Sequence, residues 1–236
     1  ARPARCASHR ARCAVAPMTT IWLVLLGGGL SLDAVAVGQF MLSRPFVGAW
    51  LSGWLVGDAL AGALAGALLE LYLLAAVPSG AARVPEPGPG AVIAGAAAAW
   101  PSIGAVGSTP AALRPGALVL SMALALVFGW LGGRTQLWQR HWVGRRLPVV
   151  ERAPDRAADP ATAVSRAHLG ALVIDFARGA ALTLTGVLLV RWLVPLYAPQ
   201  WPLSAAATGG VLLPGALVSP GVAGRGMQGA ARWPHL

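Results

Sequence analysis

Three long stretches without a charged residue constrain the fold of this chain more than any other feature. They cover residues 87–113, 115–133 and 192–224. A helix needs about 20 apolar residues to cross the hydrocarbon core of a bilayer, so each stretch approaches or exceeds the length of one span. Of the 236 residues, 56% are hydrophobic and 11% are charged, whereas a soluble domain carries about 25% charged residues. The sequence therefore predicts an all-α, polytopic integral membrane protein.

Six hydrophobic segments are predicted, some of them broken or re-entrant. Three consecutive glycines, residues 27–29, predict a break in the first segment. The second segment is too long for one span, so we expect a span plus a re-entrant piece, and its glycines at four-residue spacing predict close helix packing. Residues 78–90 are rich in Pro and Gly and predict a connection that is not a regular helix. The segments lie at residues 19–42, 46–77, 91–107, 116–133, 168–190 and 192–223.

The placement of arginine predicts how the chain is organised. Residues 134–167 contain seven Arg and three acidic residues, and cytoplasmic loops of membrane proteins are enriched in positive charge. We therefore expect a single transmembrane domain at residues 18–223, in which residues 134–167 form a cytoplasmic loop. Trp138 and Trp142 within this loop favour either a short interfacial helix or a solvated loop. Residues 1–17 are an N-terminal extension, and residues 224–236 are a C-terminal tail.

The N-terminal part allows a second interpretation. Residues 1–17 could be the basic region and residues 21–32 the apolar region of a signal peptide, with Ala34, Val35 and Ala36 as the cleavage motif. That interpretation explains neither the further apolar segments nor the polar residues that follow. We therefore favour a first membrane segment.

Several classes of function are disfavoured by composition. The net charge of +10 suggests nucleic-acid binding, but the arginines flank apolar segments and form no basic stripe with interleaved aromatics. Cys6 and Cys13 lack further ligands at metal spacing. His141 and His168 lie at the two ends of the polar loop and are interpreted as interfacial residues. We expect no nucleic-acid partner, no metal site, no cofactor and no catalytic residue.

Four acidic residues lie inside apolar segments, where a charge costs about 2.5–3.5 kcal/mol. One of them, Asp175, has Arg178 one helical turn away, and this spacing favours a local ion pair. The other three lie between residues 33 and 70, together with an amide and an arginine, and we expect this set to converge on one buried site. The set is Asp33, Gln39, Arg44, Asp58 and Glu70.

Two structural alternatives remain open for members of this set. Arg44 could simply pair with Asp58 or Glu70 across helices. On one uninterrupted helix, Asp58 and Glu70 would lie about 120° apart, and a break near Gly57 removes that objection. A half-helix that begins after Gly57 would have Asp58 as its N-cap.

Carboxylates and an amide near aromatic side chains suit a neutral polyol. They accept and donate hydrogen bonds to hydroxyls, while Phe40, Trp50 or Trp54 covers a sugar face. Proton relay is the other function that isolated intramembrane carboxylates commonly serve.

The order of the polar motifs resembles a known transporter family. "GQFMLSRP" at 38–45 is followed by "GD" at 57–58, "GALLEL" at 66–71 and "PSGAA" at 78–82. This order is similar to that of the membrane subunit IIC of the mannose/sorbose family in the bacterial phosphoenolpyruvate-dependent sugar phosphotransferase system (PTS). The resemblance covers about residues 20–100 and, more loosely, 168–182.

The resemblance implies a multi-pass subunit of the bacterial inner membrane that binds and translocates a mannose-type sugar. It implies an oligomeric complex with a membrane subunit IID and with cytoplasmic IIA and IIB carriers, in which IIC itself carries no phosphorylated residue. Two alternatives are a non-transporting IIC-like assembly or regulatory subunit and a proton-coupled small-solute transporter.

The resemblance also assigns roles to residues. Asp33, Gln39, Arg44, Asp58 and Glu70 match the polar motif positions of the family, which implies that they bind the sugar or shape its site. One departure concerns the loop after "GAA", where Pro85 and Glu86 stand in place of the usual Pro-Asp pair.

Overall fold

The structure is a computed structural model that describes residues 3–35, 40–74, 85–100, 115–151 and 160–197. In these ranges the secondary structure consists of helices, with no strand, and the predicted all-α class is confirmed. The helices are α1 (Pro3–Val35), α2 (Pro45–Val56), α3 (Ala59–Leu73), α4 (Pro87–Ala99), α5 (Pro115–Glu151) and α6 (Pro160–Tyr197).

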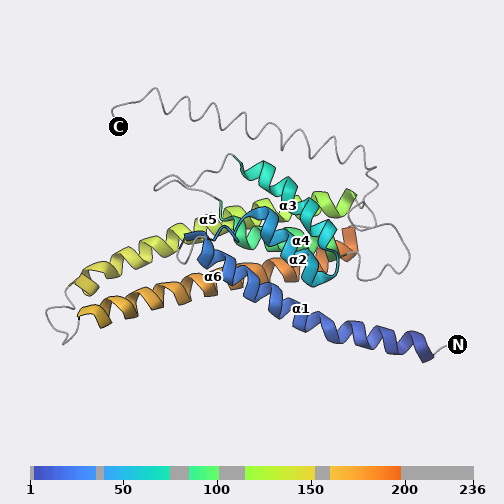
Figure 1. The fold of residues 1–236 in the computed structure, drawn as a ribbon, viewed down its shortest axis with the longest axis horizontal. Coiled ribbons are helices and arrows are strands. Elements are labelled where there is room, and N and C mark those ends of the chain that lie inside the picture. The colour runs from blue at the N-terminus through green and yellow to red at the C-terminus, as the bar shows by residue number, and fades with distance from the viewer. Residues whose placement is uncertain (1–2, 36–39, 75–84, 101–114, 152–159, 198–236) are drawn as a thin grey trace, which may run out of the picture.

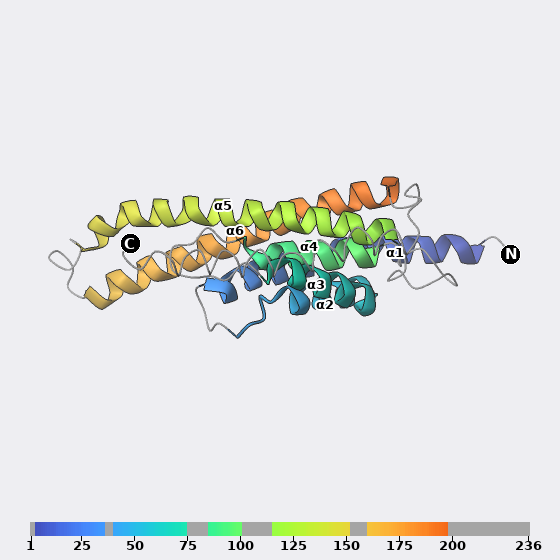
Figure 2. The same cartoon turned by 90° about the horizontal axis from the view of Figure 1, so that it is seen from above.

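The helices fall into two length classes. With 12 to 15 residues, α2, α3 and α4 are about 18–22 Å long, less than the roughly 30 Å of a hydrocarbon core. Within α5 and α6, Ala117–Arg145 and Val164–Leu193 are long and apolar enough to cross a membrane. Figures 1 and 2 show α5 and α6 running past the short helices at the end where residues 134–151 and 160–174 lie.

The short helix α4 is the centre of the packed structure. It contacts α1, α2, α3, α5 and α6, and residues 88–99 are all buried. Its glycines let the neighbouring backbones approach closely: a Cβ atom added at Gly90 would lie 2.8 Å from the carbonyl oxygen of Ala125. A helix that is apolar on all sides is stable only when it is surrounded, and α4 meets that condition.

The predicted break at residues 27–29 is wrong, because α1 continues through them. Two of these glycines lie where α1 packs on α6. A Cβ atom at Gly28 would lie 2.7 Å from the ring of Phe176, and one at Gly27 would collide with Thr183. The small residues therefore bring two helices together, which in lipid is a common use of glycine.

The second apolar segment is a helical hairpin. The expected break is confirmed at Gly57, which has a φ of 108° and ends α2 in the left-handed conformation that glycine adopts without strain. The expected full span is not found, because neither α2 nor α3 has the length. The two helices run antiparallel, and Gly53 of α2 meets Gly62 of α3.

Two predicted connections are shorter than expected. The prediction of an irregular connection at 78–90 is wrong for its last residues, because α4 begins at Pro87. Proline is tolerated there because it needs no N–H partner in the first turn of a helix. The loop at 134–167 is wrong for most of its length, since α5 continues to Glu151 and α6 begins at Pro160. Arginine is a good helix former, so these arginines do not end the helix. Residues 101–107 of the third expected segment and residues 198–223 of the last one lie outside the described residues.

Replacing Gly53 by alanine is expected to lower the free energy of unfolding by about 1–3 kcal/mol, because overpacking forces backbone shifts. The new Cβ atom would lie 2.6 Å from the Cα of Gly62 and 2.7 Å from the carbonyl oxygen of Asp58. Thermal unfolding in detergent checks this. Gly29→Ala is the matched control, because no atom lies within 4 Å of its added Cβ atom. Equal melting temperatures for the two variants would contradict the packing argument.

Candidate functional site

Polar side chains gather at one end of the short helices. Leu30 near the end of α1 lies against the first turns of both α2 and α4: an added Cβ atom at Gly48 or Gly88 would lie 2.9 or 3.1 Å from its side chain. The same end includes the second half of α3, which begins at Gly66, where this glycine packs against Phe46. Two clusters lie here, and they differ in exposure and in partners.

The first is the loop cluster, which we define as Asp33, Arg44 and Glu70 with the connection at residues 40–44. Asp33 is buried, and its two carboxylate oxygens accept hydrogen bonds from the backbone N–H groups of Phe40 (2.7 Å) and Ser43 (2.8 Å). Between them Met41 has a φ of 61°, an uncommon conformation for a residue other than glycine. Such conformations persist where the surroundings hold them, often at functional sites. Asp33 therefore fixes the shape of the turn that leads into α2.

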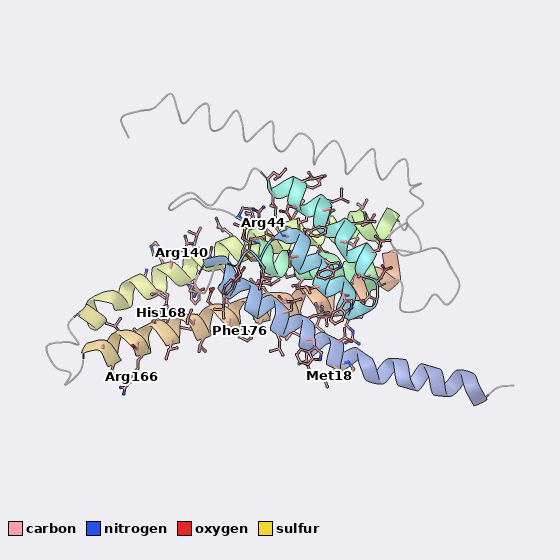
Figure 3. The ribbon with its side chains drawn as sticks, in the orientation of Figure 1. Met18, Arg44, Arg140, Arg166, His168 and Phe176 are labelled. Carbon is pink, nitrogen blue, oxygen red and sulfur yellow. The ribbon has the colours of Figure 1, made fainter. Side chains whose placement is uncertain are left out.

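Arg44 and Glu70 complete the loop cluster. Arg44 donates to Glu70 at 2.9 Å, which settles the alternative between Asp58 and Glu70 as its partner. The second oxygen of Glu70 accepts from the N–H of Phe46 at 3.1 Å, so the carboxylate also lies at the positive N-terminal end of α2. The side chains are 52% and 26% exposed, and Figure 3 labels Arg44 beside α2. This pair is ordered and still accessible to a ligand.

Asp58 lies elsewhere. Its side chain accepts from the N–H of Ala61 at 2.9 Å and caps α3, as the N-cap alternative predicted. Asp58 and Glu70 are twelve residues apart on one helix, or about 18 Å. The prediction that all of these residues converge is therefore wrong for Asp58, because a cap must sit at the start of α3. Gln39 lies outside the described residues.

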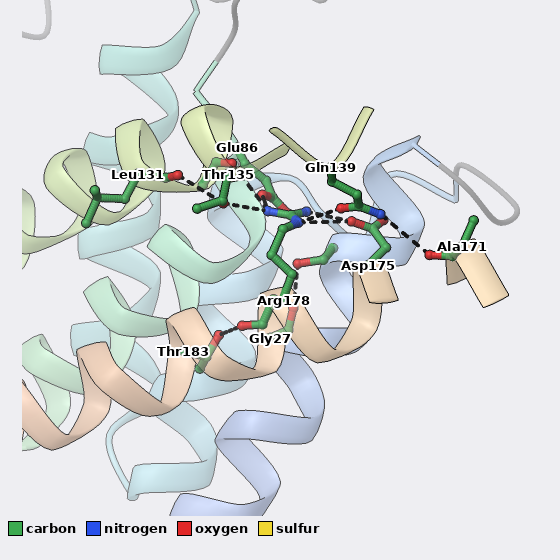
Figure 4. A network of polar contacts seen from close by, with 12 residues as sticks. Gly27, Glu86, Leu131, Thr135, Gln139, Ala171, Asp175, Arg178 and Thr183 are labelled. Atoms are coloured by element: carbon green, nitrogen blue, oxygen red, sulfur yellow. Dashed lines mark hydrogen bonds and ion pairs between the residues drawn. The ribbon is translucent and has the colours of Figure 1, made fainter. Parts of the chain in front are cut away.

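The second cluster is the arginine network, which we define as Arg178 and its side-chain partners (Figure 4). Arg178 forms ion pairs with Asp175 at 2.6 Å and with Glu86. The Asp175 pair was predicted from spacing. The guanidinium also donates to a side-chain amide, a hydroxyl and a backbone carbonyl, at distances of 2.9 to 3.3 Å; these belong to Gln139, Thr135 and Gly132. The network ties α4 to α5 and α6.

The arginine network is closed. The side chains of Glu86 and Asp175 are only 1% and 7% exposed, and no buried side-chain nitrogen or oxygen in the described ranges lacks a hydrogen bond. The charged groups of this network therefore pair with one another inside the protein, where an unpaired charge would be strongly destabilising. The sequence singled out Glu86 only as a departure from a family pattern, and it missed Gln139 and Thr135.

The loop cluster is therefore the better candidate for binding a ligand. It offers an exposed guanidinium, a carboxylate held by two partners and the 74% exposed side chain of Phe40. The carboxylate accepts hydrogen bonds, the guanidinium donates them, and an aromatic ring covers apolar C–H groups. That combination suits a small polyhydroxylated molecule.

Comparisons with known proteins give a family and a fold. The family model described as "PTS system sorbose-specific iic component" matches residues 16–216. No curated protein matches the chain. A solved structure titled "Structure of membrane protein" is similar to this chain with a TM-score of 0.63 and 20% sequence identity, over 89% of this chain and 79% of the other. At that identity the likeness concerns the fold.

Proposed function

Since the chain belongs to the family of sorbose-specific IIC components of the phosphotransferase system, we propose that it binds and translocates a mannose-type sugar through the loop cluster. Membership of the family makes the chain an integral membrane component of a PTS sugar transporter that works with other PTS subunits. We propose in addition which sugar the chain binds, which residues bind it and which subunits are its partners.

The observation that carries the proposal is the Arg44–Glu70 pair. It lies between apolar helices, and both side chains are partly exposed. A sugar hydroxyl can donate to Glu70 and accept from Arg44 without either group losing its charge partner. Phe40 lies on the turn that leads into α2, Trp50 and Trp54 lie on α2, and all three are exposed. Aromatic rings there provide stacking for the apolar face of a sugar.

The other predicted residues take supporting roles in this proposal. Asp33 holds the turn at residues 40–44 through two backbone hydrogen bonds, which positions Phe40 and Arg44. Gln39, the residue before Phe40 in the sequence, is included as a source of an amide group. Asp58 shapes the site indirectly, because its cap fixes the start of the helix that carries Glu70.

We further propose that the chain acts in the bacterial inner membrane in an oligomeric complex with IID, and that IIA and IIB carriers deliver the phosphoryl group on the cytoplasmic side. The seven arginines at residues 134–167 support a cytoplasmic placement of this region, because positive charge is enriched in cytoplasmic loops.

The test is sugar uptake by cells that produce this chain with IID, IIA and IIB subunits. We expect labelled mannose or sorbose to accumulate as the phosphorylated sugar, and we expect accumulation to stop when IID or phosphoenolpyruvate is removed. Uptake that ignores phosphoenolpyruvate and collapses with an uncoupler would instead support a proton-coupled transporter. A complete complex that binds its carriers without any uptake would support a non-transporting subunit.

A further inference from the structure

A stripe of basic and aromatic side chains runs along α5 where this helix extends past the ends of the short helices. Its members recur at spacings of four, four, three and four residues, so at about 100° per residue they lie within an arc of about 80°. All five side chains are exposed, and the two tryptophans are 57% and 68% exposed. The stripe consists of Trp130, Arg134, Trp138, His141 and Arg145.

Side chains of the stripe contact one another and line a cavity. The guanidinium of Arg134 lies 5.4 Å from the ring centre of Trp130, within the range of a cation–π interaction. Further along, a shallow cavity of about 240 Å³ is lined by Trp138, His141 and Arg145 with the flanking Leu137 and Trp142. Positive groups and aromatic rings therefore line one continuous path.

The charged residues of the stripe begin where the uncharged stretch of α5, residues 115–133, ends. Residues 115–133 are uncharged, and Arg134 is the first charged residue after them. A stretch of 19 residues is about 28 Å long, close to the roughly 30 Å of a hydrocarbon core. Helical side chains lean toward the helix N-terminus, and the N-terminal part of α5 is the uncharged stretch, residues 115–133. Trp138 and Arg145 thus lean back toward the membrane surface.

The charge on this part of α5 has one sign. Between residues 134 and 150 the sequence contains four arginines and no acidic residue. Glu86 and Asp175, which join residues of α5 in the arginine network, are buried and are held by Arg178. Among the side chains that the structure describes, neither Arg134 nor Arg145 forms an ion pair. An anionic lipid headgroup is a complement that the membrane surface supplies to such exposed arginines.

We propose that this stripe binds the headgroup of an anionic phospholipid. Arg134, at the end of the uncharged stretch, contacts the phosphate oxygens, and Trp130 packs on the acyl chains below it. Trp138 lies at the level of the headgroup, and Arg145, about 16 Å from Arg134 along α5, leans back toward the membrane surface and attracts the negative charge of the headgroup. Tryptophan is enriched at this depth because its ring is apolar while its N–H is polar. The proposal needs only an integral membrane protein, so it does not depend on the proposed sugar site.

The test compares lipid retention by the purified full-length chain in a neutral detergent. The delipidated protein is mixed with equal amounts of phosphatidylglycerol and phosphatidylcholine, and bound lipids are counted by native mass spectrometry. We expect the wild type to retain phosphatidylglycerol preferentially. An arginine near an anionic headgroup contributes a factor of roughly five, so Arg134→Gln with Arg145→Gln is expected to lower that preference about 25-fold.

The matched control is Arg140→Gln. Arg140 is exposed on the same part of α5 (Figure 3), but it lies about 120° around the helix from Arg134, so this variant is expected to keep the wild-type preference. The proposal is wrong if the wild type retains both lipids equally or if Arg140→Gln loses as much as the double variant. It is also wrong if millimolar inorganic phosphate displaces the lipid, or if the double variant keeps the wild-type lipid preference.

Discussion

Replacing Arg178 by leucine is expected to lower the free energy of unfolding by about 3–5 kcal/mol, because removing one partner of a buried ion pair leaves an uncompensated charge. Here two carboxylates lose the same partner. The side chains of Glu86 and Asp175 are 1% and 7% exposed, so water replaces little of the lost partner. Thermal unfolding in detergent measures the effect. Arg44→Leu is the control, since a pair that is half-exposed contributes about 0–1 kcal/mol.

A triple variant distinguishes the effect of unpaired charges from the effect of lost side-chain packing. Arg178→Leu combined with Glu86→Gln and Asp175→Asn removes the unpaired charges and should recover most of the lost stability, because the amides are neutral and similar in volume to the acids. If the single and triple variants unfold at the same temperature, the stability comes from packing of the arginine stem and our account of the network is wrong.

Replacing Glu70 by glutamine is expected to reduce sugar uptake about 10- to 100-fold while leaving stability within about 1 kcal/mol of the wild type. A hydrogen bond to a charged group contributes about 1.5–3 kcal/mol, and the amide keeps the size of the side chain but not its charge. Arg44, which is 52% exposed, stays solvated without its partner. Uptake of labelled sugar and thermal unfolding are measured on the same preparations.

Asp58→Asn is the matched control for Glu70→Gln. It is also an acid-to-amide change in the α2–α3 hairpin, but asparagine caps a helix about as well as aspartate. Because Asp58 accepts from Ala61 at the far end of α3, this variant is expected to keep both uptake and stability. Equal loss of uptake in the two variants would place Asp58 in the sugar site.

The features that the sequence predicted correctly are local. The break at Gly57 and the cap at Asp58 follow from two adjacent residues, and the Asp175–Arg178 pair follows from a spacing of one turn. Each depends on backbone preference or helical periodicity alone. The partner of Arg44 was narrowed to two residues, and the fold then selected Glu70 because the hairpin places the end of α3 beside the start of α2.

The features that the sequence missed depend on contacts between distant segments. Glu86 is 92 residues from Arg178, and no periodicity connects them. Gly27 and Gly28 have low intrinsic helix propensity, and only the packing of Thr183 and Phe176 against them explains why α1 is continuous. The arginines after residue 133 indicate where α5 leaves the apolar zone, but they do not reveal that the helix continues to Glu151.

The most direct test of the sugar site is equilibrium binding of labelled mannose or labelled sorbose, whichever the wild type binds, to the purified complex of this chain with IID. This measurement separates binding from phosphoryl transfer. Our account predicts that Glu70→Gln weakens binding about 10- to 100-fold, whereas Asp58→Asn binds like the wild type. Wild-type affinity in the Glu70→Gln complex would contradict the proposal that the loop cluster holds the sugar.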